Sequence, residues 1–163
     1  MQLINAMPPV IDTEQYDAWK KQWASQEGLD IHFYINDQCH PEQMLLFSTL
    51  FFPTFVVSQG GVFLERNFSV ETFARCLSLA SHDMAEAERL LNYVKLYDVF
   101  GQYGDGVSHS IFLQLCEVIG FAWRMVLKEK FPDKLFSVEV SNSDENYGPV
   151  VTFYQVKCEK RER

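Results

Sequence analysis

A group of polar residues surrounds the glycine-rich loop that runs from Gly101 to Gly106 and leads into a helical pattern. Its members are Tyr97, Asp98, Tyr103, Asp105 and His109. A histidine can take up a proton or bind a metal, and a neighbouring carboxylate such as Asp105 can orient its ring. A carboxylate at the negative end of a helix, the position predicted for Asp98, is unfavourable and points to a specific partner. We therefore treat these five as candidate binding residues. The favoured alternative is an exposed turn whose polar residues satisfy backbone groups.

Known phosphate-binding motifs do not fit this loop. The Walker pattern ends in Gly-Lys-Ser/Thr, whereas this loop ends in Gly106-Val107-Ser108 without a lysine. The dinucleotide fingerprint follows a strand, and here a helical pattern precedes the glycines. Asp105 would also place negative charge where a phosphate would lie. The sequence holds no HExxH or GxSxG motif, so no catalytic residue and no cofactor are predicted.

A metal site is a weak interpretation of the other clustered ligand types. Asp37, Cys39 and His40 lie close together in sequence, but structural zinc prefers four ligands in paired spacing. A loop that caps the following helix is the better interpretation, so no metal is predicted. The four cysteines are spaced by about 40 residues without a CxxC pair. That spacing indicates neither a disulfide framework nor a zinc site, and we expect a reduced, cytoplasmic protein.

The elements that must position these residues are organised around residues 43–64, which hold no charged side chain. A membrane span needs about 20 apolar residues, but Pro53 and the turn signal Gln59-Gly60-Gly61 interrupt this stretch. We predict a short buried helix over 42–50. A buried hairpin should follow, with strands at 55–58 and 62–66.

The rest of the chain predicts a mixture of helices and one mainly antiparallel sheet. Helices are expected over about 13–28, 69–80, 84–100 and 109–130, with a strand at 30–35 and a second hairpin formed by 136–140 and 150–156. These patterns indicate a single α+β domain of about five helices and two hairpins. Residues 1–11 should form an extended arm, and residues 159–163 a frayed charged tail.

Tyr16, Trp19 and Trp23 recur at helical spacing and so share one face of the first predicted helix. We expect this aromatic stripe to pack the helix onto the body of the protein. An exposed docking stripe is the alternative.

Charge is spread unevenly along the chain. The net charge is −8, and residues 1–123 hold 15 acidic and 6 basic side chains. An acidic protein is repelled by phosphate, so we expect neither a nucleic acid nor a membrane as its partner. An acidic surface can instead attract a basic protein.

These observations predict a non-enzymatic protein-interaction domain that binds a basic partner. Bacterial immunity proteins and other small acidic inhibitors share this general character, although no motif links this chain to them. The alternative is an enzyme or a small-ligand-binding protein with a polar site around Gly101–His109. A homodimer formed through the aromatic stripe or an edge of the C-terminal hairpin is also open.

Overall fold

The computed structural model describes residues 2, 4–7, 9–101, 106–142 and 148–156. Over this part of the chain there are seven α-helices, one short 3-10 helix and five strands in two antiparallel sheets. The fold is α+β, as predicted, with seven helices instead of about five. The chain divides into two compact units, Met1–Ser48 and Thr49–Arg163. The single domain therefore stays a prediction.

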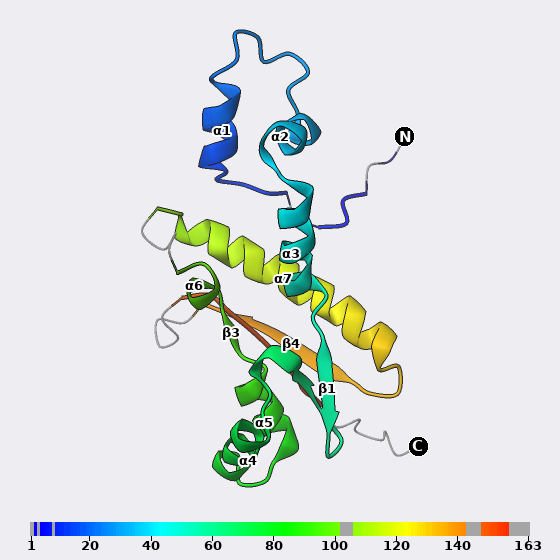
Figure 1. Cartoon of the computed structure of the whole chain (residues 1–163). Helices are drawn as coiled ribbons and strands as arrows, with labels where there is room; N and C mark the ends of the chain where they lie inside the picture. The colour runs from blue at the N-terminus through cyan, green and yellow to red at the C-terminus, as the bar shows by residue number, and fades with distance from the viewer. Residues whose placement is uncertain (1, 3, 8, 102–105, 143–147, 157–163) are drawn as a thin grey trace. The chain divides into compact units, whose positions relative to one another are not determined.

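The first unit contains α1 (Glu14–Lys20), α2 (Ile31–Gln38) and most of α3 (Pro41–Phe51) (Figure 1). Trp19 is its one buried large apolar side chain among the described residues. The Trp19 indole packs edge-on against Tyr34 of α2, with ring centroids 5.2 Å apart. Its Nε1 donates a hydrogen bond of 2.7 Å to Asp37 Oδ2. The aromatic stripe thus packs α1 against α2, within this unit.

Two predictions for the first unit are wrong. The strand expected at 30–35 is part of α2, because Asp30 caps that helix by accepting a hydrogen bond from the Phe33 amide at 2.9 Å. The first helix ends at Lys20 and does not reach Gly28. Described residues of the predicted N-terminal arm belong to no helix or strand, and the predicted tail lies outside the described residues.

The uncharged stretch divides into a helix and a hairpin, as predicted. After α3, strands β1 (Phe55–Ser58) and β2 (Gly61–Leu64) pair around the turn Gln59-Gly60. Both turn residues have positive φ, 49° and 84°, as in the tight turns that match strand twist. β2 is buried along its whole length, whereas α3 contains no buried residue. The prediction of a buried helix is therefore wrong.

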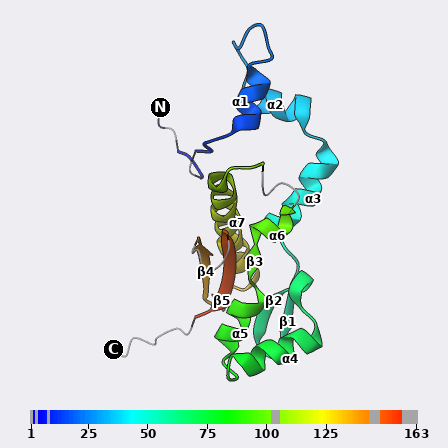
Figure 2. The same cartoon turned by 90° about the vertical axis from the view of Figure 1, so that its left-hand side faces the viewer.

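The core of the second unit lies between α7 (His109–Lys130) and the sheet β3-β5-β4 (Figure 2). The long helix and the hairpin of β4 (Phe136–Ser141) and β5 (Val150–Gln155) agree with the sequence prediction. α7 is long and apolar enough to cross a membrane, by length and composition only. Its buried face packs on the sheet, where Trp123 meets Phe153 with ring centroids 5.6 Å apart. That face serves as a core face of this unit.

A second, smaller core lies under α4 (Val70–Leu79) and α5 (Met84–Leu91), where Phe63 packs against Phe73 at 5.2 Å. Ser69 and Asp83 cap these helices, as predicted. The helix predicted over 84–100 is wrong. The chain leaves α5 at Asn92, forms the short strand β3 (Val94–Lys95) against β5, and then begins α6 (Leu96–Val99).

Two buried polar side chains, Glu88 in α5 and Asn92 directly after this helix, join the two sheets. Glu88 accepts hydrogen bonds from the amides of Val62 in β2 (2.7 Å) and Gln155 in β5 (2.6 Å). One turn later, Asn92 accepts from the Leu64 amide at 2.8 Å and donates to the carbonyls of Val62 and Phe153. These side chains replace the main-chain pairing that β2 and β5 do not make there. Both are fully buried, so the bridge is part of the core.

Candidate functional site

Tyr97 and His109 are the two candidate residues that the structure brings together. The Tyr97 hydroxyl lies 2.7 Å from His109 Nδ1, within hydrogen-bond distance. The Tyr97 ring also packs edge-on against Phe112, with centroids 4.9 Å apart, and Phe112 is buried in the core. Tyr97 is half-buried and His109 exposed. When the phenol donates to Nδ1, the imidazole carries its proton on Nε2. The pair thus presents a polarised ring nitrogen to its surroundings.

The Tyr97 ring also lies close to Gly148. A Cβ added at Gly148 would lie 2.6 Å from Tyr97 Cδ2, and the glycine has a φ of +110°. A side chain there would therefore meet both the ring and a strained backbone. Nothing in the sequence indicates this contact, because Gly148 lies 51 positions after Tyr97.

Asp98 lies apart from the Tyr97–His109 hydrogen bond. It is exposed and belongs to the first turn of the four-residue helix α6, so the predicted placement at the end of a long helix is wrong. Its negative charge acts on Tyr93: burial raises the pKa of that phenol, and the charge of Asp98 raises it further. The remaining candidates, Tyr103 and Asp105, lie outside the described residues.

The ligand types at 37–40 have structural roles in the described chain. Asp37 accepts hydrogen bonds of 2.7 Å from both Trp19 Nε1 and Gln38 Nε2. These bonds lower the pKa of its carboxyl group, with the Trp19 bond as the larger cause. His40 Nδ1 accepts from the Glu42 amide at 3.2 Å, at the start of α3, as expected of a capping loop. Among the residues that the structure describes, no three histidine, cysteine, aspartate or glutamate side chains gather as metal ligands.

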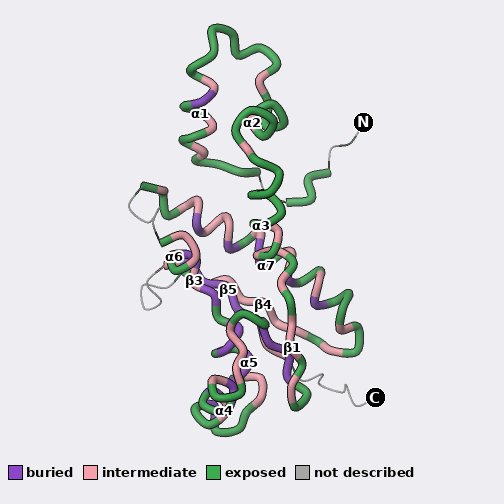
Figure 3. Tube along the Cα trace, in the orientation of Figure 1, coloured by how far each residue is buried: buried purple, intermediate pink, exposed green. Residues whose placement is uncertain are grey.

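Exposed apolar side chains on α2 and α3 are a feature that the sequence prediction missed. Large parts of both helices are exposed (Figure 3). On α3, Leu45 is 71% exposed and Met44 47%. The signal was the absence of a polar face on α3, which predicted burial. Burial inside the chain and burial against a partner leave the same pattern in a sequence, and only the structure separates them.

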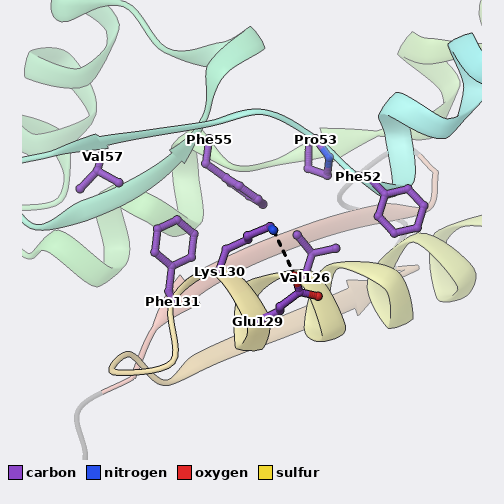
Figure 4. A pocket seen from close by; sticks show the side chains of 8 residues that line it. All are labelled: Phe52, Pro53, Phe55, Val57, Val126, Glu129, Lys130 and Phe131. Carbon is purple, nitrogen blue, oxygen red and sulfur yellow. Dashed lines mark hydrogen bonds and ion pairs between the residues drawn. The ribbon is translucent and has the colours of Figure 1, made fainter.

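The second unit has a groove with apolar walls between β1 and the last turns of α7 (Figure 4). Its volume is about 610 Å³. Phe52, Pro53 and Phe55 line it from the β1 side, and Val126 and Phe131 from the α7 side; Val57, Glu129 and Lys130 complete its lining. The Lys130 ammonium is 3.1 Å from Glu129 Oε1 at the rim. A smaller pocket of about 220 Å³ lies beside Arg89, whose Nε is 3.2 Å from Glu139 Oε2.

Comparisons with protein-family models, with curated proteins and with solved structures found no match to this chain. The functional argument therefore depends on the residues themselves.

Proposed function

We propose that this protein acts as a non-enzymatic, inhibitor-like interaction protein that binds a basic protein partner through its first unit. One observation carries the proposal: Met1–Ser48 combines an acidic charge with apolar side chains that the unit does not bury. Both properties lie in the same 48 residues of sequence.

The first unit holds a disproportionate share of the negative charge. Residues 1–48 contain seven acidic and two basic side chains, a net charge of −5 out of −8 for the whole chain. Residues 49–163 then carry the remaining −3, from 15 acidic and 12 basic side chains. A potential concentrated in this way attracts a basic surface and speeds its association.

The first unit also holds 12 of the 22 large apolar side chains that are exposed in the described chain, but only one of its 19 buried apolar residues. Four of these side chains are consecutive on α3: Met44, Leu45, Leu46 and Phe47. Exposed apolar side chains that form a contiguous patch mark an interaction site. Burying it contributes about 25 cal/mol per Å², and surrounding charges then set the choice of partner. The combination favours a basic partner that has apolar side chains at its centre.

The test is capture of partners from a lysate by the full chain, at low and at high salt. We expect captured proteins to be basic, to be released as salt rises, and to be lost with the double variant Met44→Ser/Leu45→Ser. The matched control is Val70→Ser/Leu79→Ser, because Val70 and Leu79 are 72% and 71% exposed on α4 of the second unit. That control should retain the same partners.

Three results would contradict the proposal. These are captured proteins without an excess of lysine and arginine, captured proteins that stay bound as salt rises, and equal loss of the captured proteins with both double variants. Any of these would mean that neither the charge nor the apolar side chains of the first unit select the partner.

A second candidate function is a small-ligand site, or an enzyme site, around Gly101–His109. The hydrogen bond between Tyr97 and His109 favours it, since it fixes the orientation of an exposed imidazole. A small-molecule screen by thermal shift tests this function. Stabilising compounds should lose their effect with His109→Ala, while that variant should melt at nearly the same temperature as the wild type without a compound.

A further inference from the structure

The main-chain amides and carbonyls along the outer edges of the two sheets differ in whether they form hydrogen bonds. On the outer edge of β2, the amides of Val62 and Leu64 donate to the side chains of Glu88 and Asn92. On the outer edge of β4, the Val138 carbonyl accepts a hydrogen bond of 3.4 Å from Arg124. Side chains of the protein thus occupy part of each of these edges.

The outer edge of β1 differs. The Glu65 amide donates to the Thr54 carbonyl at 2.9 Å, which fixes the alternation of the hairpin. Phe55 and Val57, opposite Leu64 and Val62, therefore direct their amides and carbonyls away from β2. Among the residues that the structure describes, none forms a hydrogen bond with these groups, and Val57 is 58% exposed. This edge can accept one more strand.

The groove described above runs beside this same edge. Figure 4 shows Phe55 directed toward α7 and Phe131 directed toward β1, with Phe52 and Val126 further along. A strand added to β1 would alternate its side chains, so every second one would point toward these apolar walls. Backbone pairing would supply affinity, and the groove would supply selection for apolar side chains.

Charge at the groove does not restrict the occupant to one sign. The negative end of the α7 dipole lies beside Lys130, the last residue of the helix. The one carboxylate of the groove lining, Glu129, lies 3.1 Å from the Lys130 ammonium. The charges of the lining therefore balance, and selection depends on strand pairing and on the apolar walls.

We propose that the β1 edge binds an extended peptide segment of a partner protein, in which apolar residues alternate with polar ones. The segment would pair with Phe55 and Val57 and place its apolar side chains in the groove between β1 and α7. This site is on the second unit and does not depend on the proposed role of the first.

The experiment is selection of random ten-residue peptides displayed on phage, with the full chain as target. We expect enriched sequences in which apolar residues alternate with polar ones. Affinity for a selected peptide, measured by fluorescence anisotropy, should fall by about tenfold or more with Val57→Pro, which removes the outward amide donor. Val57→Thr keeps the amide and a strand-favouring side chain, and should stay within about twofold of the wild type.

A second pair of variants keeps the test valid if Val57→Pro unfolds the protein. Phe52→Ser removes an exposed groove side chain and should weaken the peptide by about tenfold. Phe121→Ser removes a ring that is 42% exposed on α7 and does not line the groove, and should change nothing. Selection without enriched peptides, or peptides that bind both Val57→Pro and Phe52→Ser as well as the wild type, would overturn the proposal.

The same variants separate this site from the proposed function of the first unit. Met44→Ser/Leu45→Ser should leave peptide binding intact, whatever it does to the captured partners. If Val57→Pro instead abolishes a concentration-dependent dimer measured by sedimentation, then the occupant is a second copy and the peptide proposal is wrong.

Discussion

Tyr97 illustrates how single residues define a local site. Its ring contacts Phe112 in the core and Gly148, which precedes β5, while its hydroxyl reaches His109. Two other segments, the start of α7 and the residue that precedes Pro149 and β5, therefore fix one side chain of α6. Tyr97 therefore has a structural role whether or not a ligand binds beside it. A substitution at Gly148, which contacts the ring, measures that role directly.

We predict that Gly148→Ala destabilises the fold by about 1–3 kcal/mol, because the added Cβ meets the Tyr97 ring at 2.6 Å and Gly148 has a φ of +110°. Gly101→Ala is the matched control, since no atom lies within 4 Å of a Cβ at that position. Urea unfolding followed by circular dichroism measures both. Equal stability of the two variants would mean that Tyr97 moves aside without cost.

Asp37 gives a prediction about pH. Its pKa is lowered from 3.8, chiefly by the hydrogen bond from Trp19. A lowered pKa in the folded state contributes stability that is present above 3.8 and is lost as pH falls through the folded value. We expect the indole N–H resonance of Trp19 to shift over that acidic range, and Asp37→Asn to remove the shift.

The Trp123 indole is the internal reference for this titration, because its Nε1 donates to the Leu50 carbonyl at 2.9 Å and meets no titrating group there. Trp19→Phe assigns the resonance. Simultaneous movement of both indoles would indicate acid unfolding of the whole chain instead of a local event at Asp37.

At the scale of the elements, the sequence was sufficient to predict those helices and strands that are determined by residues near to one another in the chain. The helix over 109–130 and the hairpins were predicted to within a residue or two, because apolar periodicity and turn residues act locally. The strand predicted at 30–35 was wrong. A run of six residues fits both the two-residue period of a strand and the 3.6-residue period of a helix, and the cap at Asp30 favours the helix.

Long-range contacts explain the other errors. The pattern of 84–100 looks helical throughout, yet the chain leaves α5 where the Asn92 side chain bonds to β2 and β5, and Val94 then pairs with Val151. Nothing in the local sequence of these residues indicates their contacts with β5, about 60 positions away. The candidate site shared this limitation: proximity in the chain placed Tyr97 and His109 in one group of candidates, with Asp105 expected to orient the histidine, but the Tyr97–His109 hydrogen bond and the contribution of Gly148 require the fold.

We predict that Asn92→Asp costs about 3–5 kcal/mol, because a carboxylate oxygen would then face the carbonyls of Val62 and Phe153 in a fully buried position. Asn67→Asp is the matched control, since Asn67 also donates from its amide to two carbonyls but is only half-buried. Its cost should be smaller, about 1–2 kcal/mol, when measured by chemical denaturation. Equal costs would show that burial of the bridge contributes nothing.

At the scale of the whole molecule, the two units differ in what holds them together. Of the 19 buried apolar residues in the described chain, 18 belong to the second unit and Trp19 alone to the first. Because burial of apolar surface is the main stabilising term, the first unit should open at a far lower free energy than the second. An interaction protein gains from this difference when the partner supplies the missing burial.

We therefore predict that amides of α1, α2 and residues 41–48 exchange hydrogen with solvent faster than those of α7 by about a thousandfold or more in the isolated protein. Mass spectrometry of peptic fragments measures the difference, and addition of a captured basic partner should protect these segments selectively. Protection equal to that of α7 without a partner would mean that the chain or a second copy already covers the apolar side chains. Native mass would then separate those two cases, because only a second copy doubles it.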